Sequence, residues 1–184
     1  MKRISLSLRS SLIIAVTSFM FSGKADAAIQ TVPYVDVTQY LGAWYQISHI
    51  PLSFEGDCAC SRQVLDLANN GSGRVSVWNS CNTKTPTGAL REIRGFATND
   101  DPTTNAKFTV DFGIPGKLGT YWVIGLGQNY EYAIVSEPTE SSLYILSKTP
   151  TLDPVLYQEA LAKAAAQTDT SRLVVTEQNG CTYP

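Results

Sequence analysis

The stretch Leu41-Gly42-Ala43-Trp44-Tyr45 begins the first of a series of short segments that are rich in β-branched and aromatic residues. Gly42 allows the tight turn with which a chain can start a strand, because glycine has no Cβ. Trp44 is large enough to plug one end of a closed sheet, and its indole N–H needs a carbonyl partner when it is buried. We therefore expect Trp44 to be a structural core residue that contacts no ligand.

Eight such segments follow one another at spacings of about ten residues. They cover approximately residues 43–50, 61–68, 74–80, 89–98, 106–112, 120–127, 130–136 and 142–148. Clusters of Gly, Asn, Asp and Pro separate them, with the clearest hairpin loop at Asn69-Asn70-Gly71-Ser72-Gly73 and a second tight turn at Gln128-Asn129. This succession is typical of an all-β barrel or sandwich.

The segment at residues 106–112 shows how the two faces of the sheet differ. Phe108, Val110 and Phe112 share one face, and the polar residues between them share the other. An inside and an outside are thereby defined. A barrel of eight strands can be filled by side chains or can leave room for one small ligand, and this pattern leaves both open.

Two further elements follow the β segments. Asp153 can cap a helix whose first residue is Pro154, and one apolar stripe continues from there. The stripe consists of Leu156, Ala160, Leu161 and Ala164. An extended piece, residues 172–177, then offers Leu173, Val174 and Val175 for pairing with an open barrel edge, which would be the edge of the first strand.

Residues 1–27 have the pattern of a cleaved signal peptide: a basic start, an apolar run at 12–21, and Ala25-Asp26-Ala27 at the cleavage positions. A membrane span is disfavoured because Thr17, Ser18 and Ser22 interrupt the run. We expect one mature domain, residues 28–184, exported to the periplasm, the cell envelope or the extracellular space. No cysteine precedes Cys58 for lipid attachment, so we expect a soluble protein with at most peripheral membrane contact.

The charge of the mature domain limits the classes of partner. Without the four basic residues of the leader and Asp26, 10 Lys and Arg stand against 15 Asp and Glu, a net charge of −5. Such an excess of negative charge disfavours nucleic acid, other anionic polymers and acidic membranes as partners.

Four cysteines, Cys58, Cys60, Cys81 and Cys181, lie in the mature domain. An even count in an exported chain predicts two disulfides, for which three connectivities are possible. Cys58-Ala59-Cys60 is one residue short of a redox Cys-x-x-Cys motif, and His49 is the only histidine. We therefore expect neither a metal site nor a cofactor.

Three blocks in this order resemble the lipocalin family, in particular its bacterial lipocalin and apolipoprotein D branch. They are Gly42-x-Trp44, then Tyr121-Trp122-Val123-Ile124 with Ala133-Ile134-Val135, and finally Leu143-Tyr144-Ile145-Leu146-Ser147-Lys148-Thr149-Pro150. The resemblance covers nearly the whole mature chain. It implies an eight-stranded antiparallel up-and-down barrel with one C-terminal helix packed outside and a short terminal strand.

Lys148 departs from the family pattern, in which an arginine commonly stacks on the signature tryptophan. A lysine can still form a cation–π contact with Trp44, of about 0.5 to 2 kcal/mol. It lacks the planar stack and the forked donors with which arginine holds neighbouring carbonyls. We therefore expect a slightly looser closed end of the barrel.

Resemblance to apolipoprotein D implies a bridge between Cys60 and Cys181, which leaves Cys58 and Cys81 for the second. Strand parity agrees, because Cys60 faces outward toward the tail if Leu65 faces inward. Hairpin register alone suggests Cys60 opposite Cys81.

The resemblance also implies a ligand pocket inside the barrel. Matching positions are Phe54 at the mouth, then Leu65, Asn79, Phe112, Tyr121 and Tyr144. Alternation adds Val77, Phe108, Val110, Val123 and Leu146. These residues form an apolar cup that suits an acyl chain or a flat hydrophobe.

The function that these patterns favour is noncatalytic binding and transport or storage of a small hydrophobic molecule such as a fatty acid or lysophospholipid. One alternative is a tetrapyrrole, haem or bilin, for which His49 is the only conceivable imidazole ligand. A second is a lipid-modifying enzyme, although no catalytic residues stand out. An outer-membrane barrel is disfavoured because Lys107, Asp111 and Glu131 occupy outward positions.

Overall fold

The computed structural model describes residues 28–53, 57–68 and 72–184, so the predicted leader, Phe54 and part of the predicted loop at 69–73 lie outside it. The elements are α1 (Val37–Tyr40), β1 (Gly42–His49), β2 (Cys58–Leu67), β3 (Val75–Thr83), β4 (Leu90–Asn99), β5 (Lys107–Asp111), β6 (Leu118–Leu126), β7 (Tyr132–Ser136), β8 (Leu143–Ser147), α2 (Pro154–Ala165) and β9 (Val174–Val175). All eight predicted strands are present, with ends within 3 residues of those expected.

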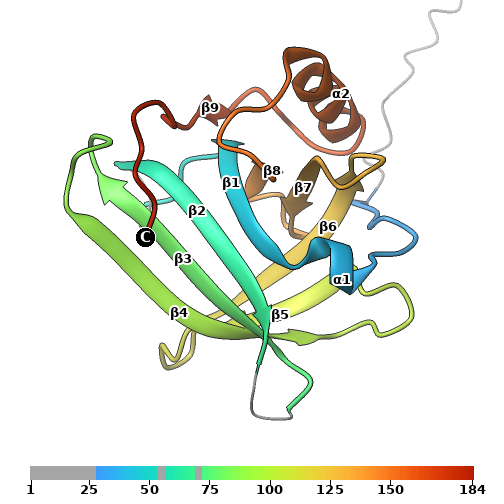
Figure 1. Cartoon of the computed structure of the whole chain (residues 1–184). Helices are drawn as coiled ribbons and strands as arrows, with labels where there is room; N and C mark the ends of the chain where they lie inside the picture. The colour runs from blue at the N-terminus through green and yellow to red at the C-terminus, as the bar shows by residue number, and fades with distance from the viewer. Residues whose placement is uncertain (1–27, 54–56, 69–71) are drawn as a thin grey trace, which may run out of the picture.

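The eight long strands form a closed antiparallel barrel (Figure 1). Each strand pairs with the next, and β1 closes the ring by pairing with β2 on one side and β8 on the other. Gly42 lies opposite Leu65 where β1 starts. Its φ of +95° is a conformation that glycine adopts freely, as expected at this turn. The predicted all-β barrel is confirmed.

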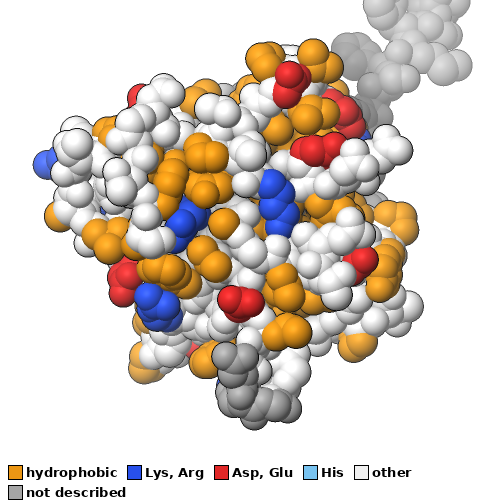
Figure 2. All heavy atoms as spheres, viewed as in Figure 1, with side chains coloured by type: hydrophobic (Ala, Val, Ile, Leu, Met, Phe, Trp, Pro, Cys, Tyr) orange, Lys and Arg blue, Asp and Glu red, His pale blue; other side chains and the backbone are white. Residues whose placement is uncertain are grey.

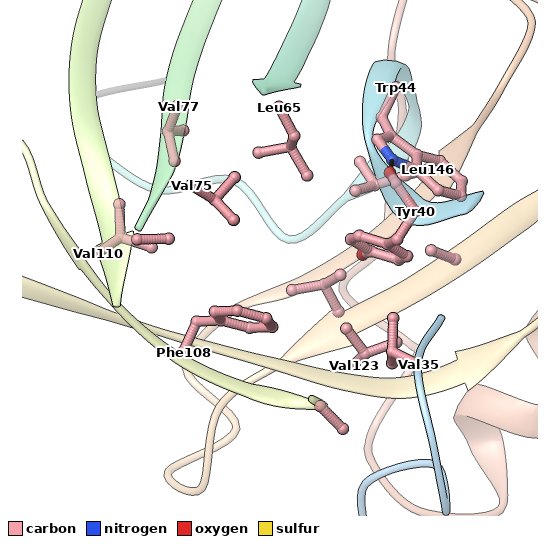
Figure 3. Close-up of a cluster of buried hydrophobic side chains, with 14 residues drawn as sticks. Val35, Tyr40, Trp44, Leu65, Val75, Val77, Phe108, Val110, Val123 and Leu146 are labelled. Carbon is pink, nitrogen blue, oxygen red and sulfur yellow. Dashed lines mark hydrogen bonds between the residues drawn. The ribbon is translucent and has the colours of Figure 1, made fainter. Parts of the chain in front are cut away.

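The core fills the inside of the barrel from alternate positions of the strands (Figure 3). Phe108 and Val110 are buried while Asp111 is exposed, as the alternation predicts. The fully or largely buried members of this cluster are Val35, Tyr40, Trp44, Leu65, Val75, Val77, Ala97, Ala106, Phe108, Val110, Val123, Ala133, Val135 and Leu146.

The helix α2 packs outside the barrel against β6 and β7 (Figure 1). Asp153 caps it by accepting hydrogen bonds from the backbone N–H groups of Val155 and Leu156, and Pro154 is its first residue, as predicted. Ala160 and Ala164 are buried on the face toward the barrel. No helix in the described part of the chain is both long enough and apolar enough to span a bilayer.

The short helix α1 was not predicted. Asp36 caps it by accepting a hydrogen bond from Thr38 N, and Tyr40 is its buried residue. Four residues make little more than one turn, so they show no apolar periodicity by which the sequence could reveal a helix.

The outer face of β2, β3 and β4 carries charged side chains next to apolar ones. Arg94 and Arg62 lie over the ring of Trp78, with the guanidinium carbon 4.1 and 5.4 Å from the ring centroid. Arg74 covers Phe96 in the same way, at 4.3 Å. The side of the molecule seen in Figure 2 accordingly intersperses charged and apolar side chains.

Two disulfides connect Cys58 to Cys81 and Cys60 to Cys181, the pairing that the resemblance implies. The register of β2 against β3 shifts between Ala59 and Arg62, so β2 bulges at Cys60. Cys60 N donates to the carbonyl of Glu177, which holds the tail beside this bulge. β9 pairs with β1 at Ser48 and His49, as expected for the terminal strand.

Gly95 marks a close approach of β4 to the end of β5. A Cβ at this position would lie 2.3 Å from the carbonyl oxygen of Asp111, which belongs to the backbone and cannot turn away. We predict that Gly95→Ala lowers the free energy of unfolding by about 1 to 3 kcal/mol, as overpacking does. Urea denaturation will measure the change.

The matched control for this prediction is Gly119→Ala, because Gly119 also lies within a barrel strand, β6. Its Cβ would lie at ordinary contact distance, 3.7 Å from the carbonyl oxygen of Val110. A destabilisation by Gly119→Ala equal to that of Gly95→Ala would show that the approach of Asp111 is not what requires glycine.

Candidate functional site

The closed end of the barrel is built around Trp44, which is fully buried. Its indole N–H donates to the carbonyl of Tyr40 at 2.7 Å, so the expected carbonyl partner comes from α1. The ammonium of Lys148 lies 4.1 Å from the centre of the Trp44 ring system, which confirms the expected cation–π contact.

Lys148 also holds backbone carbonyls, a role that the family pattern gives to the forked donors of an arginine. Its Nζ donates to the carbonyl of Leu41 at 2.6 Å and to that of Tyr40 at 3.3 Å. A single ammonium has three N–H donors, so it can serve two adjacent carbonyls without the planar fork of arginine. Burial at this position lowers the pKa of Lys148 to about 8.

A small cavity, with about 30 Å³ of space for the centres of water-sized molecules, lies inside the barrel above this closed end and is partly open to solvent. Its lining is apolar apart from two tyrosines and one glutamine. The lining residues are Val35, Val37, Tyr40, Leu41, Gln63, Leu65, Val75, Val77, Ala97, Phe108, Val110 and Tyr121.

Five of the predicted pocket residues line this cavity: Leu65, Val77, Phe108, Val110 and Tyr121. The other described ones are not part of its lining. Val123 and Leu146 are buried in the same core, Phe112 and Tyr144 pack against it, and Asn79 reaches the lining only through a hydrogen bond to Gln63. Phe54 lies outside the described residues.

Seven lining residues were not predicted from the sequence: Val35, Val37, Tyr40, Leu41, Gln63, Val75 and Ala97. Strand parity could have found the last three, because each shares a face with an inward neighbour such as Leu65 or Val77. The first four lie in or beside α1, which the sequence did not reveal.

A chain of hydrogen bonds crosses the floor of the cavity. The hydroxyls of Tyr40 and Tyr121 lie 2.8 Å apart, and Tyr121 donates to Gln63 Oε1 at 3.1 Å. Gln63 Nε2 donates in turn to Asn79 Oδ1 at 3.2 Å. Burial raises the pKa of both Tyr40 and Tyr121, so both phenols stay protonated and neutral.

His49 does not line the cavity. It is buried where β1 meets β9, with Nδ1 3.1 Å from Thr176 Oγ1, and burial lowers its pKa. His49 therefore offers no imidazole to a ligand in this cavity, so the alternative of a tetrapyrrole gains no support from it.

Comparisons with known proteins agree with this architecture. Residues 35–178 match the model of the lipocalin-like domain. The chain is similar to apolipoprotein D of Oryctolagus cuniculus, 34% identical over 157 residues that cover 79% of this chain and 78% of the relative. It is also similar to outer membrane lipoprotein Blc of Escherichia coli (strain K12), 32% identical over 146 residues, with 79% and 80% covered.

Among solved structures, insecticyanin from the tobacco hornworm Manduca sexta has a similar fold. The TM-score is 0.67 with 20% sequence identity, and the match covers 86% of this chain and 90% of insecticyanin.

The contact between Lys148 and Trp44 gives a stability prediction with a defined pH dependence. At pH 7 we expect Lys148→Arg to raise the free energy of unfolding by about 0.5 kcal/mol, since arginine adds a planar stack on the indole. Because the folded lysine has a pKa of about 8, it releases a proton that the unfolded chain still binds up to its ordinary pKa near 10.5. Wild-type stability therefore rises from pH 8 to pH 10 relative to the arginine variant.

Urea denaturation of both proteins at pH 7, 8, 9 and 10 tests this. The advantage of Lys148→Arg should shrink as the pH rises, because arginine stays charged in both states. Lys107→Arg, in which the original lysine lies over Trp122 on the outer face, serves as the control. An advantage that stays constant over this range would show that Lys148 does not lose its proton near pH 8.

Proposed function

Because the chain belongs to the lipocalin family, we propose that it binds a small hydrophobic molecule inside the barrel and transports or stores it without chemical change. The ligand that we propose is a lipid with one acyl chain, such as a fatty acid or a lysophospholipid. The observation that carries the proposal is the apolar cavity at the centre of the barrel.

The size and lining of the cavity support a slender apolar ligand. The cavity is small, with about 30 Å³ of space for the centres of water-sized molecules, so a bound ligand has to be slender and has to displace side chains of the lining as it enters. Nine of its twelve lining residues are aliphatic or Phe, and the described lining contains no histidine. An acyl chain matches these properties better than a tetrapyrrole does.

The relatives support a lipid as ligand and export as destination. The name of apolipoprotein D refers to an association with lipid, and the name of outer membrane lipoprotein Blc places that relative in the cell envelope. Two disulfides fit an oxidising compartment, since such bonds form and persist outside the cytosol. We propose the periplasm, the cell envelope or the extracellular space as the location.

Binding rather than catalysis is proposed because of what surrounds the cavity. All four cysteines are joined in disulfides, so none supplies a thiolate nucleophile. The polar side chains in the described lining are two neutral phenols and an amide, which are suited to hydrogen bonding.

We predict that Ala97→Phe abolishes ligand binding by filling the cavity, since Ala97 is buried on the inner face of β4. The matched control is Thr98→Phe, which places the same side chain on the outer face of the same strand, where Thr98 is exposed. Purified mature protein is titrated with the fluorescent fatty acid cis-parinaric acid, and tetradecanoate and lysophosphatidylcholine are then used as competitors.

Saturable binding to wild type and Thr98→Phe, with at least tenfold weaker binding to Ala97→Phe, is the expected result. Equal binding by all three proteins would place the ligand outside the barrel and contradict the proposal. Mass spectrometry of lipids extracted from protein purified from its native host then identifies the bound species.

A further inference from the structure

We propose that the floor of the cavity is a hydroxyl-binding subsite, formed by Tyr40, Tyr121 and Gln63, that receives the alcohol group of an uncharged lipid inserted head first. The inference rests on the proposed binding of a lipid in the barrel, and it favours an uncharged lipid alcohol over the fatty acid or lysophospholipid given there as examples. It starts from the position of the only polar groups in the described lining. They lie together at the closed end, where an acyl tail alone would leave them without a further partner.

Counting protons shows which hydrogen bonds the floor still offers. Tyr121 donates its single proton to Gln63 Oε1, so the 2.8 Å contact between the two phenols requires Tyr40 to be the donor. Both phenol oxygens keep acceptor capacity, and the amide nitrogen of Gln63 has a second N–H beyond the one given to Asn79. The floor therefore presents acceptors beside a donor.

A hydroxyl group complements this arrangement because it both donates and accepts. A carboxylate only accepts, so it would meet the lone pairs of the two phenols and leave them unpaired. It would also bring a charge into an apolar cavity whose described lining contains no Lys, Arg or His. An uncharged alcohol avoids both costs.

Lys148 does not alter this conclusion, although it is near the floor. Its ammonium lies over the ring of Trp44 and donates to the backbone carbonyls of Tyr40 and Leu41. It is not part of the cavity lining. Figure 3 shows Tyr40 between Trp44 and Phe108, with its ring toward the centre of the barrel.

The mouth of the barrel is apolar at positions that an emerging tail would follow. Phe112 packs at the edge of the core beyond Val110, and Ile93 shares the face of Asn79 and is 37% exposed. Arg91 and Asp57, whose side chains form an ion pair at 3.2 Å, belong to the same end. In the competing arrangement, the carboxylate of a ligand stays beside these charged residues at the mouth, and its tail extends toward the floor of the cavity.

Three ligands with the same ten-carbon chain separate these arrangements. Decan-1-ol donates and accepts, decyl methyl ether only accepts, and decanoate is charged at pH 7.5. Their dissociation constants are measured by displacement of N-phenyl-1-naphthylamine from the mature, disulfide-bonded protein. We expect decan-1-ol to bind about fivefold or more tightly than either of the others, as one hydrogen bond supplies.

Two isosteric variants test the residues themselves. Tyr121→Phe and Tyr40→Phe should each weaken decan-1-ol binding to the level of the ether, while binding of the ether changes less than twofold. Tyr45→Phe is the matched control, because Tyr45 faces outward on β1 and its ring packs edge to face with that of Tyr183. Thermal unfolding confirms that each variant is folded, and the comparison of ligands on wild type does not depend on any variant.

Each remaining outcome counts against a different statement. If decanoate binds as tightly as decan-1-ol, or if the preference for the alcohol survives both tyrosine variants, the hydroxyl subsite is wrong and the proposed lipid-binding function stands. If neither the ten-carbon ligands nor tetradecanoate and lysophosphatidylcholine displace the dye, the proposed function itself fails and the subsite fails with it.

Discussion

The hydrogen bond from the indole of Trp44 to the carbonyl of Tyr40 joins the two elements on which the closed end depends. It holds α1 across the start of β1, and the ring of Tyr40 then lies 4.9 Å from Trp44 and faces the inside of the barrel. Lys148, just after β8, donates to the same carbonyl at 3.3 Å. The start of β1 and the residue after β8 thus both bind the carbonyl of Tyr40. These bonds fix the position of Tyr40, whose side chain forms part of the floor of the cavity.

What could be predicted from the sequence is the wall of the barrel. The family resemblance gave Leu65 as an inward residue. Alternation of apolar and polar residues then placed Val77, Phe108 and Val110 on the inside, because a period of two leaves no other choice once one face is buried. Helix α2 was predictable for an equally local reason, since Asp153 and Pro154 form a start signal that needs no tertiary contact.

What could not be predicted is the floor. α1 is too short to show a period, and its position is determined by tertiary bonds such as that from Val35 N to Thr104 O. Tyr40 therefore carried no sign that it meets Tyr121, 81 residues later in the chain. Gln63 was missed although it shares the parity of Leu65, because the sequence does not show the hydrogen bonds to Tyr121 and Asn79 that satisfy this polar side chain inside the barrel.

Local departures from regular pairing determine where the tail is held. The bulge at Cys60 interrupts the alternation of β2, so a parity argument that extends across residues 59–62 loses its basis there. The resulting bridge to Cys181 closes a loop of 121 residues, a length for which the chain-entropy model gives a stabilisation of about 4 to 5 kcal/mol. That bridge holds the tail beside β1, where β9 covers an edge that would otherwise be unpaired on that side.

The polar floor also bears on how a barrel of this kind could both take up and release a ligand. Unpaired polar groups in an apolar cavity cost free energy, and a floor that needed a ligand to satisfy it would be unstable when empty. Tyr40, Tyr121, Gln63 and Asn79 avoid this because each bonds to the next without any ligand. A bound hydroxyl would extend this existing chain of hydrogen bonds by one group. The free energies of the empty and filled states would then differ by about one net hydrogen bond plus the burial of the apolar tail. Specificity then comes from the floor and most of the affinity from the wall.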